Sequence, residues 1–119
     1  MWNVGRLRVL LWRPFLGKVG RDVIFLGSVR IAGMRGVHLG NHVSVNRNCI
    51  LDGTGELLIG NHVMIAQDTC IYSAQHKFDR LDIPMMRQGV EKKQTVIEDD
   101  VWLGAGATIL PVSEWVEEV

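Results

Sequence analysis

A five-residue motif that returns after twenty residues constrains the fold of this chain more than any other feature. Residues 39–43 read LGNHV, residues 59–63 read IGNHV, and residues 97–101 hold a looser copy, IEDDV. Aliphatic residues also recur at every sixth position in three series, which are Leu39, Val45 and Leu51, then Ile59, Ile65 and Ile71, then Ile97, Leu103 and Ile109. A step of six matches neither the period of two of a strand nor the period of 3.6 of an α-helix.

The spacing predicts a triangular coil of short parallel strands. Two steps of six and one of eight, as from Leu51 to Ile59, give three strands for each turn of twenty residues. Successive turns then stack about 4.8 Å apart. In this arrangement Val45 lies under Ile65 and Leu39 under Ile59 inside the prism, and each buried aliphatic side chain contributes about 1.5–3 kcal/mol.

The second position of three hexapeptides is glycine, at Gly40, Gly60 and Gly104. A corner of the coil demands a tight turn, and glycine adopts a positive φ at little cost. The sequence therefore predicts an unusual φ at these positions.

The repeat is interrupted between residues 72 and 96. The step from Ile59 to Ile97 is 38 residues instead of twenty, so about eighteen residues leave the coil at one corner. The inserted segment, assigned to residues 73–95, is polar and charged and contains Pro84. Binding and catalytic groups concentrate on such excursions from a rigid scaffold. This loop is the first candidate for a functional site.

The composition indicates one small globular domain. The chain has 119 residues, of which 47% are hydrophobic and 22% charged, and its formal net charge is zero. Nucleic-acid binding, which needs a clustered basic surface, is not expected. Two cysteines, Cys49 and Cys70, are too few for a disulfide framework and indicate a reducing, cytoplasmic location.

Residues 1–22 form a basic, amphipathic N-terminal arm. Five basic residues precede the first acidic one, Asp22, and alternate with Trp, Leu and Phe. The arm lacks the uninterrupted apolar core of a signal peptide and the length of a membrane span. Such an arm can lie on an anionic membrane surface. We favour packing onto the body of the protein, with Pro14 ending any helix near its own position.

Three segments resemble the hexapeptide-repeat O-acetyltransferases, the family of the maltose, galactoside, nodulation and colanic-acid acetyltransferases. They are VNRNCILD at 45–52, IYSAQHKFD at 71–79 and VIEDDVWLGAGATILP at 96–111. The resemblance implies an all-β fold, a left-handed parallel β-helix over residues 23–112. It also implies transfer of an acetyl group from acetyl-CoA to a hydroxyl of a sugar or glycan, without a metal.

The resemblance assigns the acceptor side of the site to three residues. His76, just before the loop, corresponds to the general base. An imidazole, with an ordinary pKa near 6.5, can accept a proton from a hydroxyl near neutral pH. Asn46 corresponds to the residue that binds the acceptor, and Asp52 corresponds approximately to an acidic residue of the same region.

The resemblance assigns the donor side to Trp102, Gly104, Ala105 and Gly106. These residues match the wall along which the pantetheine arm of coenzyme A runs, where small side chains leave the backbone accessible. The family forms homotrimers with the site between neighbouring prisms, so His76 of one subunit is expected opposite Asn46 of the next.

Simpler interpretations stand beside these roles. His76 as a surface histidine, Asn46 as a cap of a corner and Trp102 as packing at a subunit contact all stay open. His42 and His62 occupy equivalent corners one turn apart, and two ligands make no closed metal site, so we expect solvated corners. A zinc enzyme of the γ-carbonic-anhydrase type needs three histidines in a pattern that the four histidines here do not supply.

The tail departs from the family. After residues 109–111, ILP, the repeat is not resumed, and we expect a shortened β-helix whose open end is covered by the atypical segment 113–119. Trp115, Val116 and Val119 would face the prism. Because further coils of the family hold part of coenzyme A, the alternative function is a trimeric scaffold that has lost turnover of acetyl-CoA.

Overall fold

The computed structural model describes residues 2–111, and their side chains from Val4 onward. The tail 113–119, and the capping role predicted for Trp115, Val116 and Val119, lie outside the described residues.

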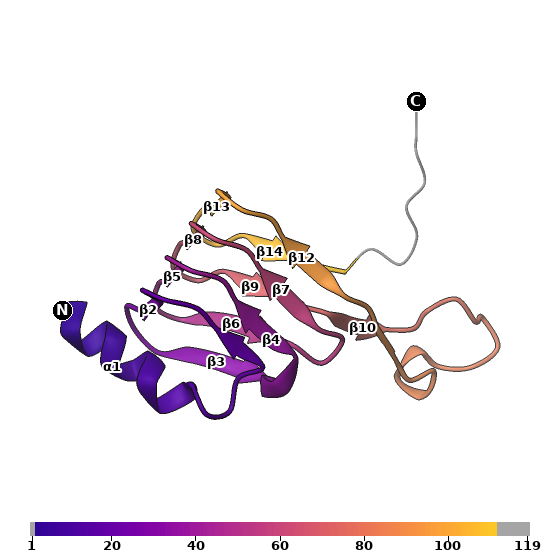
Figure 1. The fold of residues 1–119 in the computed structure, drawn as a ribbon. Coiled ribbons are helices and arrows are strands. Elements are labelled where there is room, and N and C mark those ends of the chain that lie inside the picture. The colour runs from indigo at the N-terminus through magenta and orange to yellow at the C-terminus, as the bar shows by residue number, and fades with distance from the viewer. Residues whose placement is uncertain (1, 112–119) are drawn as a thin grey trace.

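The described chain forms a left-handed parallel β-helix with three faces, each a four-stranded parallel sheet. The first face contains β1 (Lys18–Val19), β4 (Val37–Leu39), β7 (Leu57–Ile59) and β12 (Thr95–Ile97). The second contains β2 (Ile24–Phe25), β5 (Ser44–Val45), β8 (Met64–Ile65) and β13 (Trp102–Leu103). The third contains β3 (Val29–Ala32), β6 (Cys49–Asp52), β9 (Cys70–Ile71) and β14 (Thr108–Ile109). Figure 1 shows these coils stacked in order away from the N-terminal helix.

The register agrees with the repeat. Val45 pairs with Ile65, and Leu39 pairs with Ile59, as the step of twenty residues predicts. Ile97 pairs with Ile59 across the insertion, so the step of 38 residues also returns the chain to the same position of the coil. The inward side chains Leu39, Val45 and Ile65 are each 2% exposed or less.

The prediction of an unusual φ at Gly40, Gly60 and Gly104 is wrong. The described glycines with positive φ are Gly33, Gly89 and Gly106. Gly40 is needed for a different reason, because a Cβ there would lie 2.5 Å from the carbonyl oxygen of Gly60 in the next coil. The second position is therefore a place where stacked backbones approach too closely for a side chain.

The left-handed conformation instead falls on the fourth position of the motif, with φ of 58° at His42, 57° at His62 and 59° at Asp100. Non-glycine residues are uncommon there, and Asn, Asp and His are the enriched types.

The third position of the motif supplies a ladder of side-chain acceptors. The Asn41 Oδ1 accepts the N–H of Arg21 at 2.8 Å, and the Asn61 Oδ1 accepts the N–H of Asn41 at 2.8 Å. The Asp99 Oδ1 continues the ladder by accepting the N–H of Asn61 at 2.7 Å. Buried or crowded backbone donors need such partners, which explains why Asn and Asp recur at this position.

The N-terminal segment covers the open end of the first coil. Helix α1 (Trp2–Trp12) ends before Pro14 and packs against β2. Val9 of α1 and Leu16 after it are 2% and 4% exposed and join the core cluster of the coil. Strand β1 begins at Lys18, so the coil starts within residues 1–22, the predicted N-terminal arm.

Candidate functional site

The inserted segment leaves the coil through a buried, hydrogen-bonded corner. Asp52, at the end of β6, is 7% exposed, and its Oδ1 accepts the N–H and the hydroxyl of Thr54 at 3.0 and 2.5 Å. The Oδ2 of Asp52 accepts the N–H of Ser73 at 3.3 Å. The hydroxyl of Ser73 donates to the Asp52 carbonyl at 2.6 Å and accepts the N–H of Gly55 at 2.9 Å. The Asp52 carboxylate is thus occupied in holding the point where the insertion begins.

The insertion itself forms an antiparallel two-stranded arm. It is called the arm from here on and is distinct from the N-terminal segment. Strands β10 (Ala74–His76) and β11 (Val90–Lys92) pair with the register Ala74 to Lys92 and His76 to Val90. Beyond them a short 3-10 helix, η2 (Met85–Arg87), forms the tip. Figure 1 shows the arm projecting to one side of the coils.

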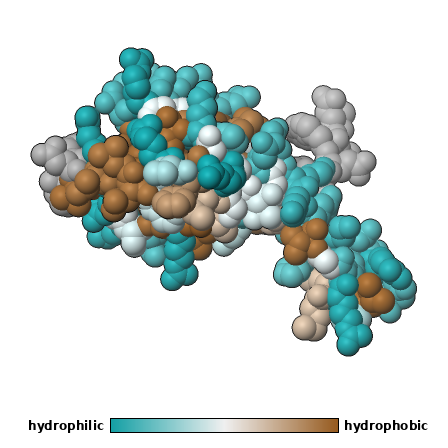
Figure 2. Space-filling model, turned by 60° about the horizontal axis from the view of Figure 1, so that its bottom comes forward, coloured by the Kyte–Doolittle hydropathy of each residue, from teal (hydrophilic) through white to brown (hydrophobic). Residues whose placement is uncertain are grey.

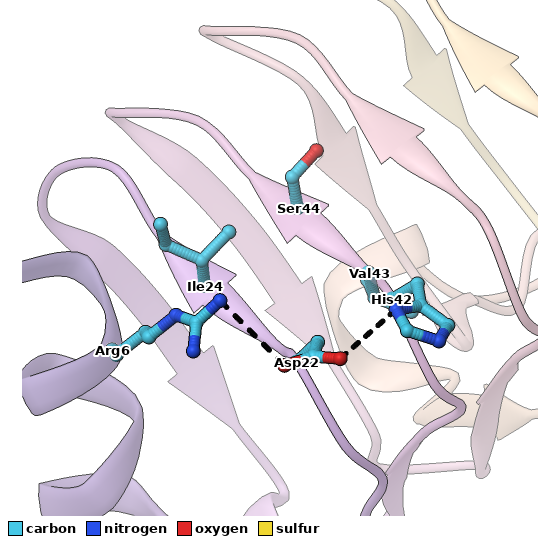
Figure 3. A pocket seen from close by; sticks show the side chains of 6 residues that line it. All are labelled: Arg6, Asp22, Ile24, His42, Val43 and Ser44. Atoms are coloured by element: carbon cyan, nitrogen blue, oxygen red, sulfur yellow. Dashed lines mark ion pairs between the residues drawn. The ribbon is translucent and has the colours of Figure 1, made fainter. Parts of the chain in front are cut away.

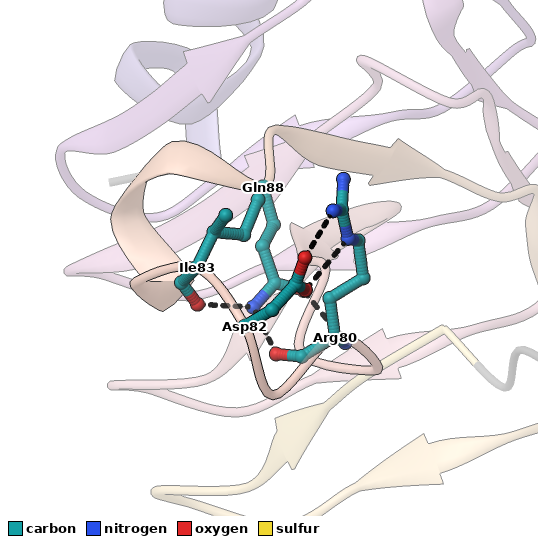
Figure 4. Close-up of polar contacts among 4 residues, drawn as sticks. All are labelled: Arg80, Asp82, Ile83 and Gln88. Atoms are coloured by element: carbon teal, nitrogen blue, oxygen red, sulfur yellow. Dashed lines mark hydrogen bonds and ion pairs between the residues drawn. The ribbon is translucent and has the colours of Figure 1, made fainter.

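The tip of the arm is held together by polar side chains (Figure 4). The Gln88 Nε2 donates to the carbonyls of Arg80 and Ile83 at 2.8 and 3.2 Å, and its Oε1 accepts the N–H of Arg80 at 3.1 Å. The Arg80 guanidinium binds the Asp82 carboxylate through both oxygens and holds the pKa of that carboxyl below its usual value.

The candidate base His76 lies at the end of β10 and is exposed. Its backbone is fixed by pairing with Val90. No described side chain hydrogen-bonds its imidazole. A general base requires a defined orientation, which a second molecule would have to supply here.

Asn46 lies at the other end of the third face, in the turn that leads from β5 into β6. Its Oδ1 accepts the N–H of Arg47 at 2.7 Å, so the amide caps the corner and leaves its Nδ2 for other contacts. His76 follows the end of this face, because β9 ends at Ile71. The structure therefore does not bring Asn46 and His76 together within one chain.

Asn46 does share a corner with the predicted donor wall. Its N–H donates to Ile65 at 2.9 Å, and one coil further on the N–H of Ala66 donates to Leu103 at 2.9 Å, so Gly104 lies two coils above Asn46. A Cβ on Gly104 or Gly106 would meet no atom within 4 Å. This corner has an accessible backbone.

Trp102 points outward from the second face and is 71% exposed. It pairs with Met64, which pairs with Ser44 in the coil below. The indole is therefore a large apolar surface next to the Gly104–Gly106 corner.

The chain is similar to known acetyltransferases over most of its length. It is 34% identical over 80 residues to the galactoside O-acetyltransferase of Lactococcus lactis subsp. lactis, covering 66% of this chain and 37% of that protein. It is 32% identical over 104 residues to nodulation protein L of Rhizobium meliloti, covering 86% of this chain and 55% of that protein. The hexapeptide-repeat acetyltransferase of Vibrio cholerae, solved with acetyl coenzyme A, superposes with a TM-score of 0.77 at 28% identity, covering 89% of this chain and 57% of that chain. In sequence and in fold, the chain is similar to the hexapeptide-repeat acetyltransferases.

The chain spans 37% of the galactoside relative and 55% of nodulation protein L. No protein-family model matches it.

The stacked histidines form a corner beside Asp22. The rings of His42 and His62 lie 4.8 Å apart at 13°, and the His42 Nδ1 is 3.2 Å from the Asp22 Oδ2. Arg6, Asp22, His42 and Ser44 border a hollow of about 320 Å³ (Figure 3). Among residues 2–111 no group of three or more His, Cys, Asp or Glu could hold a metal ion.

Sequence reasoning missed the residues that fix the arm to the coil. Ser73 and Thr54 bind Asp52, and the Thr95 hydroxyl donates to the Tyr72 carbonyl at 2.8 Å where the chain returns. The available signal was small hydroxyl residues at both ends of the interruption of the repeat.

Cys49 does not show the environment of a nucleophile. Burial raises the pKa of the Cys49 thiol, which keeps it neutral. Burial and a hydrogen bond with Cys70 raise the pKa of Tyr72. A covalent cysteine mechanism therefore has no support at Cys49.

Proposed function

We propose that this chain transfers an acetyl group from acetyl-CoA to a hydroxyl of a sugar or glycan acceptor. The observation that carries the proposal is the exposed imidazole of His76, placed at the end of a backbone-paired strand at the mouth of the insertion. The similarity to the galactoside O-acetyltransferase and to a protein solved with acetyl coenzyme A supports the choice of both substrates.

The proposed step is direct transfer without a metal. The His76 imidazole accepts the proton of the acceptor hydroxyl while that oxygen attacks the carbonyl carbon of the thioester. A carbon–oxygen bond forms, the carbon–sulfur bond breaks, and the coenzyme A thiolate leaves and takes up the proton from the imidazolium. Proton transfer of this kind contributes about 10²–10⁴-fold to a rate.

A homotrimer would complete the site. Asn46 and His76 lie at opposite ends of the third face, so a threefold arrangement can set His76 of one subunit against the Asn46 corner of another. There the Asn46 Nδ2 would donate to the acceptor, and the Gly104–Gly106 backbone with Trp102 would border the pantetheine arm. Ala105 is exposed on this corner. Asp52 would act by holding the base of the arm.

The apolar side chains of the arm support a contact with a second subunit. Four of them are 55–101% exposed, namely Phe78, Leu81, Met85 and Met86. Exposed apolar groups gathered on a projecting segment are typical of interaction surfaces. We place the protein in the cytoplasm, where acetyl-CoA is available and thiols stay reduced.

A non-catalytic trimeric scaffold is the second candidate, and one observation favours it: no described side chain orients the His76 imidazole. Calorimetric titration of the protein with acetyl-CoA, after its oligomeric state is measured, separates the two. Saturable binding in the micromolar to sub-millimolar range supports the enzyme. A well-folded trimer that does not bind acetyl-CoA supports the scaffold.

The base is tested with two matched substitutions. His76→Asn should keep acetyl-CoA binding and the trimer but lose about 10²–10⁴-fold in thiol release with sugar acceptors. His62→Asn changes another exposed histidine to a residue that tolerates its φ of 57° and should keep turnover. Full turnover by His76→Asn would show that His76 is not the base.

A further inference from the structure

Helix α1 is apolar on two opposite faces. Its inner face rests on the first coil through Val9, and Gly5 lies so close to β2 that a Cβ there would be 2.9 Å from the Ile24 Cδ1. Its outer face carries apolar side chains that are 48–70% exposed, which are Val4, Leu7, Leu10, Leu11 and, just beyond the helix, Phe15. Figure 2 shows a continuous hydrophobic area at the end of the molecule where α1 lies.

Arginine residues border this outward stripe on both sides. With 3.6 residues in each turn of an α-helix, Arg6 and Arg13 fall on one border and Arg8 on the other. Arg6 forms an ion pair with Asp22, with 3.6 Å between the Nη2 and the Oδ1 (Figure 3). Arg8 donates to the Phe25 carbonyl at 3.2 Å. The guanidinium groups therefore lie along the junction of helix and body, beside the apolar stripe.

The surroundings of the stripe are also basic. Residues 1–21 contain five basic side chains and no acidic one. Arg35 reaches the same end of the molecule, where its Nη1 donates to the Pro14 carbonyl at 3.3 Å. An apolar stripe bordered by cations matches a surface that presents anions around an apolar interior.

We propose that the outer face of α1 (Val4, Leu7, Leu10, Leu11 and Phe15) docks on the surface of a bilayer that contains anionic lipids. The apolar side chains enter the boundary of head groups and acyl chains, and the bordering arginines contact lipid phosphates. α1 has eleven residues, and no described helix is long and apolar enough to cross a membrane, so the contact is with the surface.

Charge disfavours a second copy of the chain as the occupant. A twofold contact is made by the same patch on both partners. Two α1 helices joined in this way would bring the arginines that border each stripe close to one another. Anionic lipid head groups provide the opposite charge along both borders.

The position of α1 gives the docked molecule an orientation. The coils stack away from α1 (Figure 1), so the arm and the Gly104–Gly106 corner remain on the part of the molecule that extends from the bilayer. In the proposed homotrimer, a threefold axis along the prisms would set three α1 helices on one side. Binding by three helices at once strengthens attachment without any new contact. This gain rests on the proposed trimer, whereas docking of α1 does not.

The test is sedimentation of the full chain with vesicles of phosphatidylcholine, alone or with about a third phosphatidylglycerol. We expect binding to the anionic vesicles that is at least about tenfold stronger than to the zwitterionic ones. Binding should weaken between about 0.1 M and about 1 M salt, where the screening length falls from about 10 Å to about 3 Å. A folded chain that ignores anionic vesicles overturns the proposal.

Substitutions locate the contact. Leu7→Gln/Leu11→Gln should lower the partition onto anionic vesicles by about tenfold or more, and Leu11→Gln alone, at the most exposed position of the stripe, by a smaller factor. Val96→Gln removes an apolar side chain of similar exposure, 52%, from β12 of the first face and should bind vesicles like the original chain. Equal binding by folded α1 variants would overturn the proposal.

Two further measurements separate the explanations. If Leu7→Gln/Leu11→Gln changes the oligomeric state and the original chain does not bind vesicles, α1 is an interface between copies and the proposal is wrong. Acetyl-CoA titration of the same variant should match the original chain, because α1 lies at the opposite end of the coil stack from Gly104. Loss of vesicle binding with acetyl-CoA binding kept is the expected result.

Discussion

The coil and the arm of this chain are stabilised in opposite ways. In the coil, Leu51 of β6 pairs with Ile31 below and Ile71 above and is completely buried. In the arm, every residue from Lys77 to Arg87 except Ile83 is exposed, and order depends on backbone pairing and polar side chains. The repeat therefore builds a stable frame. His76, the residue proposed as the base, belongs to a segment that contributes little to the stability of that frame.

The largest expected effect contrasts the same substitution in the two regions. Leu51→Ala removes a buried side chain from the middle of a stacked column and should lower the free energy of unfolding by about 2–5 kcal/mol. Leu81→Ala, in the arm, changes a leucine that is fully exposed within one subunit and should shift the free energy of unfolding of that subunit by no more than about 0.5 kcal/mol. Urea denaturation of both variants measures the difference. A similar loss of unfolding free energy in Leu81→Ala would mean that Leu81 is buried against another part of the assembled protein.

The next effect compares two corners of the coil. Gly40→Ala places a Cβ 2.5 Å from the Gly60 carbonyl and should lower the free energy of unfolding by about 1–3 kcal/mol. Gly104→Ala meets nothing within 4 Å and should be neutral or stabilise the chain by up to about 1 kcal/mol. The same denaturation measurement decides. An equally harmful Gly104→Ala would place another segment against that corner.

The contrast between Gly40 and Gly104 also explains which parts of the fold could be predicted from the sequence. The six-residue step predicts the coil and the pairing of Val45 with Ile65, because inward positions depend only on the local period. The conformation of Gly40 was predicted incorrectly, because crowding there comes from Gly60 in the next coil. The positive φ of His42 was not predicted at all, although the recurring Asn-His pair carried the signal.

The candidate site divides in the same way. The interruption of the repeat predicts where the arm leaves the coil, and the structure adds that Asp52 and Ser73 hold it there. The position of His76 relative to Asn46 follows from the geometry of the third face, which no pattern of residues along the chain expresses. The hydrogen bonds of Gln88 at the tip could likewise not be predicted, because this segment has no repeat.

A smaller, local effect is expected inside the arm. Gln88→Ala removes three hydrogen bonds that join the two sides of the tip, each contributing about 0.5–1.5 kcal/mol. Amide hydrogens of the arm, such as that of Arg80, should exchange about tenfold faster while the unfolding temperature stays the same. Gln94→Ala is the control, because within the described part of the chain that side chain makes one weak contact, from its Nε2 to the Glu56 Oε1 at 3.4 Å. Unchanged exchange at Arg80 would show that the tip is held by other contacts.

The smallest expected effect is the titration of Asp82 at the tip. Hydrogen bonds from Arg80 lower the pKa of this carboxyl in the folded arm. A lowered pKa means that the pair stabilises the closed tip above the ordinary aspartate pKa of about 3.9, and that this stabilisation is lost as the pH falls through the lowered value. A nuclear magnetic resonance titration of the Asp82 carboxyl should therefore have its midpoint below the ordinary value.

Substitution of the partner isolates the cause. Arg80→Gln should move the Asp82 midpoint upward toward the ordinary aspartate value, because the guanidinium no longer favours the ionised form. The pair is exposed, so added salt should shift the midpoint of the original chain in the same direction. The unfolding temperature should be the same in both proteins at neutral pH, since the coil does not contact this pair. A midpoint that stays low without Arg80 would require another cation near Asp82, and a changed unfolding temperature would tie the tip of the arm to the frame.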